Sequence, residues 1–196
     1  MHYNLKTMDI QKLIQRTQHI FTEPKREFIR ISKEQDKVLT LFIDFVLPFM
    51  IIYSVAAYLG TVFFTPATFN IGAGIILKSI ALNLLVMVTG IYVSSLIINE
   101  MLPLFQLKKD IVKISSIIIY SLTPVYIALI ASGLFPNLSM FLNLIGFYSI
   151  ILFWISTATI INMTKEHRQI FVPVISIALV LIFLFIRIIL GAIFSL

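Results

Sequence analysis

The chain has 196 residues, of which 59% are hydrophobic and 12% are charged, and its formal net charge is +6. A composition this apolar excludes a water-soluble globular protein and predicts an integral membrane protein of about one domain's length. The absence of cysteine from the sequence excludes disulfides, thiolate metal sites and cysteine nucleophiles.

Residues 1–37 form a polar, basic segment ahead of the apolar part of the chain, which we call the arm. Apolar residues recur at helical spacing from Ile10 to Phe21, which predicts a first amphipathic helix. A second helix is predicted to start at Pro24, with Thr22 as its cap.

Two interpretations of the second arm helix remain open. In the first, the helix lies on anionic headgroups, with Phe28, Ile29 and Ile31 toward the lipid and the cations toward water. In the second, the arm is a docking surface for a cytoplasmic partner. The residues assigned to this interfacial arm are Pro24, Lys25, Arg26, Phe28 and Arg30.

Five runs in the rest of the chain are long and apolar enough to cross a bilayer, because a helix needs about 20 apolar residues for a core of about 30 Å. They cover residues 38–59, 71–98, 111–132, 138–161 and 170–196. The runs lack the alternation of a membrane β-barrel. We therefore expect an all-α protein in which residues 1–37 are the arm and residues 38–196 form a five-helix transmembrane domain.

The positive charges predict how this bundle is oriented, since cytoplasmic loops are rich in Lys and Arg. Residues 1–37 contain eight of them, and the loops after the second and fourth runs contain two each, namely Lys108, Lys109, Lys165 and Arg168. The other two loops contain none. The expected topology has a cytoplasmic N-terminus and, after five crossings, an external C-terminus.

Five short motifs follow one another along the chain: "EPKREFIRI" before the first run, "DFVLPF" at its start, "NEMLP" closing the second, "YSLTP" in the third and "LIGFYSIILFWI" in the fourth. From Pro24 onward, these motifs and their order resemble those of the Yip family, the Ypt-interacting proteins, and in particular their small bacterial members. "DFVLP" is similar to the Asp-x-x-Gly-Pro stretch of eukaryotic relatives, with Leu47 in place of the glycine.

The resemblance implies a polytopic protein with a cytoplasmic N-terminus, which in eukaryotes is linked to Rab-type GTPases and vesicle traffic. It implies no catalytic residues. The compact size favours a bacterial source, so the expected location is the bacterial inner membrane, where Rab partners are absent.

Three ionisable residues are predicted to share the cytoplasmic layer of the bundle. Asp44 lies in the first run, Glu100 closes the second and Lys113 opens the third, which predicts an inner polar cluster of the three. The alternatives are that Lys113 pairs with Asp110 one turn earlier and that Asp44 reaches the interface or is protonated.

Two prolines and two cations stand out within the apolar runs. Pro48 and Pro124 each remove a backbone donor, so each is expected to kink its helix, and Pro124 would release the carbonyl of Tyr120. Lys78 and Arg187 are outer-half cations without an evident carboxylate. They either extend toward the outer phosphates or line an anion or lipid-headgroup cavity between the second and fifth runs.

No enzyme is predicted, because the three histidines (His2, His19 and His167) are far apart in the sequence and no phosphate-binding glycine loop occurs. No catalytic residue, metal or cofactor is assigned. The expected partners are membrane lipids and a cytoplasmic protein bound through the arm, with nucleic acid excluded and homo-oligomerisation left open. Two functions remain: a membrane-organising or adaptor protein, and a small transporter or lipid-handling bundle.

Overall fold

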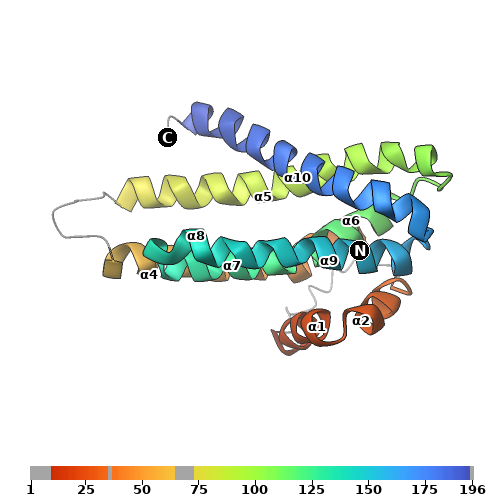
Figure 1. The fold of residues 1–196 in the computed structure, drawn as a ribbon. Coiled ribbons are helices and arrows are strands. Elements are labelled where there is room, and N and C mark those ends of the chain that lie inside the picture. Colours follow the sequence, from red (N-terminus) through yellow and green to blue (C-terminus); the bar gives the residue numbers. More distant parts are fainter. Residues whose placement is uncertain (1–9, 35–36, 65–72, 195–196) are drawn as a thin grey trace, which may run out of the picture.

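A computed structural model describes residues 10–34, 37–64 and 73–194 of the chain. These ranges are helical and contain no strand. Within them five helical units are long and apolar enough to cross a membrane: Val38–Phe64, Gly74–Phe105, Ile111–Leu134, Pro136–Ile160 and Lys165–Phe194. The predicted all-α bundle with five candidate spans is therefore confirmed (Figure 1).

The elements follow the predicted order. The arm consists of α1 (Ile10–Thr22) and α2 (Pro24–Ile31). The first span consists of α3 (Val38–Leu41), the π-helical turn η1 (Phe42–Val46) and α4 (Leu47–Phe64), and the second of α5 (Ala73–Met101) and the short η2 (Leu102–Phe105). The third span consists of α6 (Ile111–Ser121) and α7 (Thr123–Leu134). The fourth consists of η3 (Pro136–Leu138), α8 (Ser139–Leu142), η4 (Asn143–Phe147) and α9 (Tyr148–Ile160), and the fifth is α10 (Lys165–Phe194).

The third span lies at the centre of the bundle. Its α7 half packs on α4, and its α6 half packs on α5 and α9, while α10 packs on α5 and α9 at the periphery (Figure 1). The most apolar stretch of the third span is 72% buried inside the protein, whereas that of the fifth span is 11% buried. Lipid would therefore cover most of α10, and the third span is the element on which the first, second and fourth spans pack.

The contact between α4 and α7 depends on two glycines. A Cβ atom added to Gly60 would lie 1.8 Å from the carbonyl oxygen of Gly133, and one added to Gly133 would lie 3.0 Å from the backbone nitrogen of Ala57. Because small residues allow helix backbones to approach closely in membranes, these positions set the crossing of the first and third spans.

The helix of the first span is irregular just before Pro48. The amide of Leu47 donates to the carbonyl of Phe42, five residues earlier, which is a π-helical rather than an α-helical bond. A proline lacks the amide that would continue the regular ladder to Asp44, so the wider turn accommodates it. The interruption lies where the sequence predicts a kink.

The third span is interrupted at its own proline. Helix α6 ends at Ser121, Leu122 adopts a non-helical turn, and Pro124 lies in the first turn of α7. The carbonyl of Tyr120, which the proline leaves without its regular partner, accepts a hydrogen bond from the Thr123 hydroxyl at 2.6 Å. A local side chain thus satisfies the backbone at the break.

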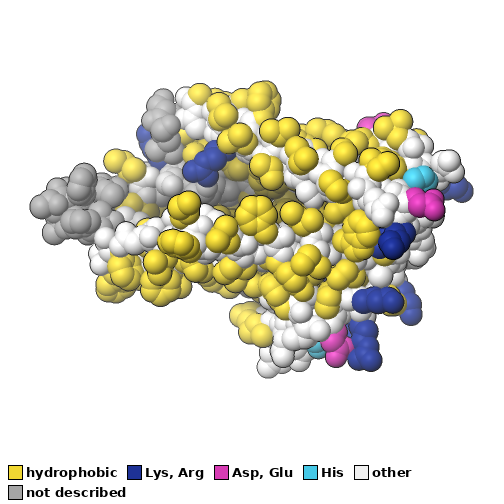
Figure 2. Space-filling model, viewed as in Figure 1, with side chains coloured by type: hydrophobic (Ala, Val, Ile, Leu, Met, Phe, Trp, Pro, Cys, Tyr) yellow, Lys and Arg dark blue, Asp and Glu magenta, His cyan; other side chains and the backbone are white. Residues whose placement is uncertain are grey.

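Charged side chains gather at one end of the bundle (Figure 2). This end holds the arm and the loops that follow the second and fourth spans. The rings of Phe105 and His167, which lie beside these two loops, pack edge to face with 5.8 Å between their centroids. We call it the charged end and the other the opposite end.

Candidate functional site

The arm is packed on the bundle at its charged end. Helix α2 packs along α9 (Figure 1). Phe28 and Ile31 of α2 belong to the same apolar core as the spans. The ring of Phe21 in α1 stacks on that of Tyr148 at the start of α9, with 5.6 Å between ring centroids. The arm and the bundle therefore share one packed core.

This packing corrects part of the interfacial assignment. The first interpretation directs Phe28 and Ile31 toward lipid, but their side chains are 0% and 4% exposed because α9 offers them an apolar surface. Ile29, Lys25 and Arg26 on the outward side of α2 are exposed.

The start of α2 agrees with the sequence, whereas its cap does not. Pro24 occupies the first position of the helix. The N-cap is Glu23, which makes no side-chain cap bond, and the Thr22 hydroxyl instead donates to the carbonyl of Gln18 at 3.0 Å. The predicted Thr22 cap is therefore wrong.

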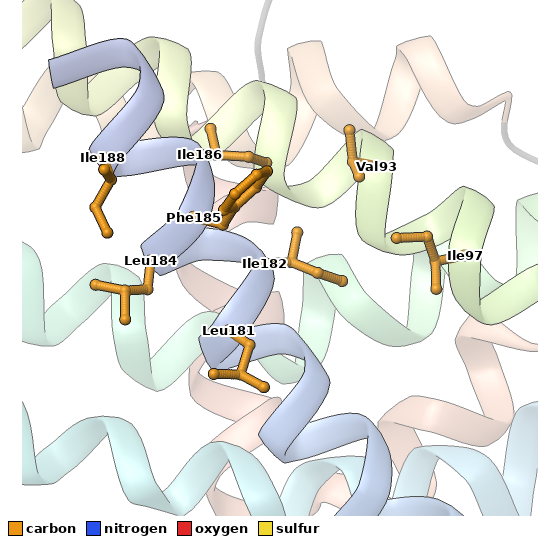
Figure 3. A pocket seen from close by; sticks show the side chains of 8 residues that line it. All are labelled: Val93, Ile97, Leu181, Ile182, Leu184, Phe185, Ile186 and Ile188. Atoms are coloured by element: carbon orange, nitrogen blue, oxygen red, sulfur yellow. The ribbon is translucent and has the colours of Figure 1, made fainter. Parts of the chain in front are cut away.

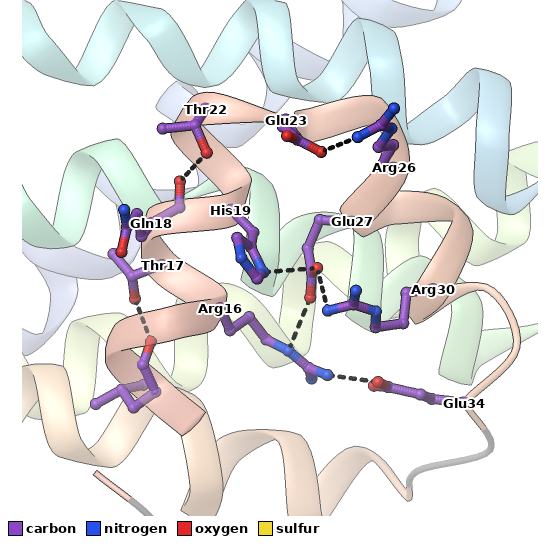
Figure 4. Close-up of polar contacts among 11 residues, drawn as sticks. Arg16, Thr17, Gln18, His19, Thr22, Glu23, Arg26, Glu27, Arg30 and Glu34 are labelled. Carbon is purple, nitrogen blue, oxygen red and sulfur yellow. Dashed lines mark hydrogen bonds and ion pairs between the residues drawn. The ribbon is translucent and has the colours of Figure 1, made fainter. Parts of the chain in front are cut away.

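A buried carboxylate lies between the two arm helices. The side chain of Glu27 is 2% exposed, and its oxygens lie 3.3 Å from Nε of Arg16, 3.0 Å from Nη1 of Arg30 and 3.5 Å from Nδ1 of His19 (Figure 4). An ionised carboxylate away from water needs such partners, because its desolvation otherwise costs several kcal/mol. Glu27 therefore joins α1 to α2.

Arg16 extends this network to the third span. Its Nη1 donates to the hydroxyl of Tyr120 at 2.7 Å, its guanidinium lies 5.3 Å from the centre of the same ring, and its Nη2 binds the carboxylate of Glu34. Burial disfavours the charged form, but Tyr120 and Glu34 outweigh this effect and raise the pKa of Arg16. The guanidinium is therefore charged at every physiological pH.

The contact with Tyr120 lies well inside the bundle. Tyr120 follows the first residue of the third span by nine positions, a rise of about 14 Å. Its ring is 2% exposed and packs edge to face on Phe45 of the first span, with 4.7 Å between centroids. One arginine thus links the arm to the most buried span. We call Arg16, His19, Glu27, Arg30, Glu34 and Tyr120 the arm network.

Sequence reasoning missed this network, although the spacing contained a signal. Glu27 precedes Ile31 by four residues, and Arg16 lies three residues after Leu13 and four before Ile20, so both charges share the apolar side of their helix. Opposite charges on the buried faces of adjacent helices predict a buried pair. The involvement of Tyr120 could not be found this way, because it depends on the tertiary position of α1.

The predicted inner cluster does not form as a set of contacts. Glu100 pairs with Lys109, and Nζ of Lys113 lies 3.5 Å from the carboxylate of Asp110, the alternative left open for it. Asp44 is exposed, and within the described ranges it makes no hydrogen bond or ion pair. The short loop after the second span supplies closer partners than the neighbouring helices do.

The two outer cations differ in their surroundings. Nη1 of Arg187 donates to Oδ1 of Asn83 on α5 at 3.0 Å, and Nδ2 of Asn83 donates to the hydroxyl of Tyr53 on α4 at 2.8 Å. Lys78 is exposed on α5, and no polar contact to it is found in the ranges that the structure covers. A protein group therefore holds Arg187 in place.

The arm network is arranged to fix one segment against another. The carboxylate oxygens of Glu27 face Arg16, Arg30 and His19, and the hydroxyl of Tyr120 accepts a hydrogen bond from Arg16. In the described part of the chain, no three His, Asp or Glu side chains are close enough to hold a metal ion.

The sequence model of the Yip1 domain matches residues 19–188, a range that includes α2, the first four spans and most of the fifth. No curated protein and no solved structure matches the chain significantly. The match covers most of the chain and agrees with the motifs that precede and enter the spans. The chain is therefore a member of the Yip1 domain family of membrane proteins.

Proposed function

We propose that this protein is a membrane-organising or adaptor protein whose arm recruits a cytoplasmic partner. The observation that carries the proposal is the docking of the arm: one side of α2 is anchored in the bundle by Phe28 and Ile31, and the other side is exposed among the described residues. A segment that merely rests on headgroups needs no buried carboxylate. A segment that presents a surface gains from being held in one orientation.

The free side of α2 has the composition of a contact surface for an acidic partner. Lys25, Arg26 and Ile29 are exposed there, and Arg30 is 63% exposed although it also contacts Glu27. Cations around an apolar side chain favour association with an acidic surface by steering the encounter and by apolar contact.

The proposed topology places this surface in the cytoplasm. The arm and the loops carrying Lys108, Lys109, Lys165 and Arg168 lie at the charged end, as the preference of cytoplasmic loops for Lys and Arg requires. With five crossings the other terminus is external.

Single cysteines introduced at Lys25 and Ile193 of the cysteine-free chain test this topology. A membrane-impermeant maleimide should label only Ile193→Cys from outside intact cells. Labelling of both or of Lys25→Cys alone would refute the topology.

The recruiting role is tested by photo-crosslinking in native membranes. A photo-reactive amino acid at Ile29, on the free side of α2, should give a discrete adduct with a protein. The same probe at Ile177, which is 62% exposed on α10, should give lipid adducts. The adduct at Ile29 should disappear when Lys25 and Arg26 are replaced by Glu, and it should persist in Lys165→Glu, which alters an exposed cation of another element.

If the Ile29 probe captures only lipid, as the Ile177 probe does, the adaptor proposal fails and the arm contacts headgroups. Deletion of residues 1–33 gives a coarser test, because an adaptor would lose its partner while lipid handling within the bundle would survive. That deletion also removes Phe28 from the surface of α9, so the point variants separate recruitment from folding more cleanly.

A further inference from the structure

Arg187 lies at the opposite end of the bundle without an acidic residue to neutralise it. It precedes the end of α10 by seven residues, a rise of about 10 Å. No Asp or Glu occurs in residues 45–99, 111–165 or 167–196 of the sequence. A cation at such a depth is costly unless it reaches a counter-charge, and none of the residues that the structure describes supplies one to Arg187.

The guanidinium is held by a polar chain that joins three spans. Asn83 accepts the bond from Arg187 at 3.0 Å, and its amide donates to the Tyr53 hydroxyl at 2.8 Å and to the carbonyl of Ser79 at 3.0 Å. The bond to Asn83 uses one of the five N–H donors of Arg187. The described residues offer the guanidinium no other hydrogen bond. A fixed fork of free donors suits a phosphate group.

An apolar groove begins beside the same arginine. It lies between α5 and α10, has a volume of about 550 Å³, and is lined by apolar side chains that include Ile186 and Ile188 on either side of Arg187 (Figure 3). Farther along, Ile182 is directed toward Val93 and Ile97 of α5. On α10 the lining runs from Ile188 back to Leu181, a rise of about 10 Å. On α5 it begins at Val93, ten residues and about 15 Å from Asn83, so the groove extends from beside Arg187 toward the middle of a hydrocarbon core of about 30 Å.

We infer that this site binds one anionic phospholipid, with its phosphate on Arg187 and an acyl chain in the groove between α5 and α10. The occupant is set by charge complementarity: Arg187, to which no described residue supplies a counter-charge, lies beside a groove in which every lining residue is apolar. Lys78 lies five residues before Asn83 on α5, toward the same end, and adds a second positive charge there. The inference does not depend on the adaptor proposal, because it concerns the other end of the bundle.

Native mass spectrometry of the full-length protein tests the site. Phosphatidylglycerol and phosphatidylcholine with identical acyl chains serve as probes, and the ratio of the two bound lipids is measured. The wild type should prefer phosphatidylglycerol, because the choline cation of phosphatidylcholine offsets the phosphate charge that Arg187 attracts. Arg187→Gln removes this discrimination and should reduce the preference about tenfold. Lys165→Gln removes a cation at the charged end and should leave the preference unchanged.

Two further variants and one competitor keep the result decisive if Arg187→Gln folds poorly. Arg187→Lys retains the charge and should retain part of the preference, whereas Val93→Trp fills the groove and should weaken binding of both lipids. Inorganic phosphate should not displace the bound phosphatidylglycerol. The inference is overturned if Arg187→Gln keeps the wild-type ratio, or if inorganic phosphate alone competes, which would make the site one for a free anion.

Discussion

Replacement of Glu27 by Gln should loosen the arm, because Glu27 joins α1 to α2 and holds the Arg16 that contacts Tyr120 of the bundle. The substitution keeps the size of the side chain but removes the charge that faces Arg16, Arg30 and His19. The dominant loss is the partly buried contact with Arg16, because Arg30 is 63% exposed and an exposed pair is worth less than about 1 kcal/mol. A hydrogen bond to a charged group contributes about 1.5 to 3 kcal/mol, so the open population of the arm should rise about 10- to 140-fold.

Hydrogen exchange of the protein in lipid nanodiscs measures this opening. Amides of residues 13–31 should exchange faster in Glu27→Gln, whereas those of α7 should be unchanged because α7 packs away from the arm. The matched control is Glu23→Gln, which removes an exposed pair with Arg26 on the same helix pair. If the arm amides of Glu27→Gln are protected as well as those of Glu23→Gln, the buried carboxylate does not hold α1 and α2 together and the role assigned to Glu27 is wrong.

Two other substitutions probe the central span. Tyr120→Phe keeps the ring but removes the hydroxyl that accepts from Arg16, so the free energy of arm opening should fall by about 1.5 kcal/mol or more in the same exchange measurement. Unchanged protection of the arm amides would mean that the hydroxyl contributes nothing. Gly60→Ala places a methyl group 1.8 Å from the Gly133 oxygen, so α4 and α7 must separate. The free energy of unfolding in mixed micelles should therefore fall by about 1 to 3 kcal/mol. Gly191→Ala, where no atom lies within 4 Å, should be neutral or stabilising, and equal effects of the two alanines would refute the close contact.

The sequence predicted the architecture because the architecture follows from local quantities. Span length, apolar run and proline position are properties of consecutive residues, and the helices of the first and third spans are interrupted beside Pro48 and Pro124. The periodicity of the arm likewise predicted two helices there. The family resemblance, which rested on motif order, was confirmed by the match over residues 19–188.

The pairing of the charges could not be predicted in the same way. Lys113 has Asp110 three residues away, and that local partner was available without any neighbouring helix. Arg16 meets Tyr120 across 104 positions of the sequence, and this contact depends on how α1 and α2 pack beside the spans. The lipid interpretation of Phe28 failed for the same reason, since an amphipathic helix has the same pattern on a bilayer as on a protein.

Thiol crosslinking measures whether the arm is docked on α9 in the membrane. The chain has no cysteine, so Phe21→Cys and Tyr148→Cys, which replace two stacked rings with centroids 5.6 Å apart, form a single reactive pair. A short bifunctional thiol reagent should link them within one chain in native membranes, and it should not link Tyr148→Cys to Ile14→Cys, where Ile14 is 60% exposed on α1. Equal yields for the two pairs, or no link in either, would contradict an arm held against α9.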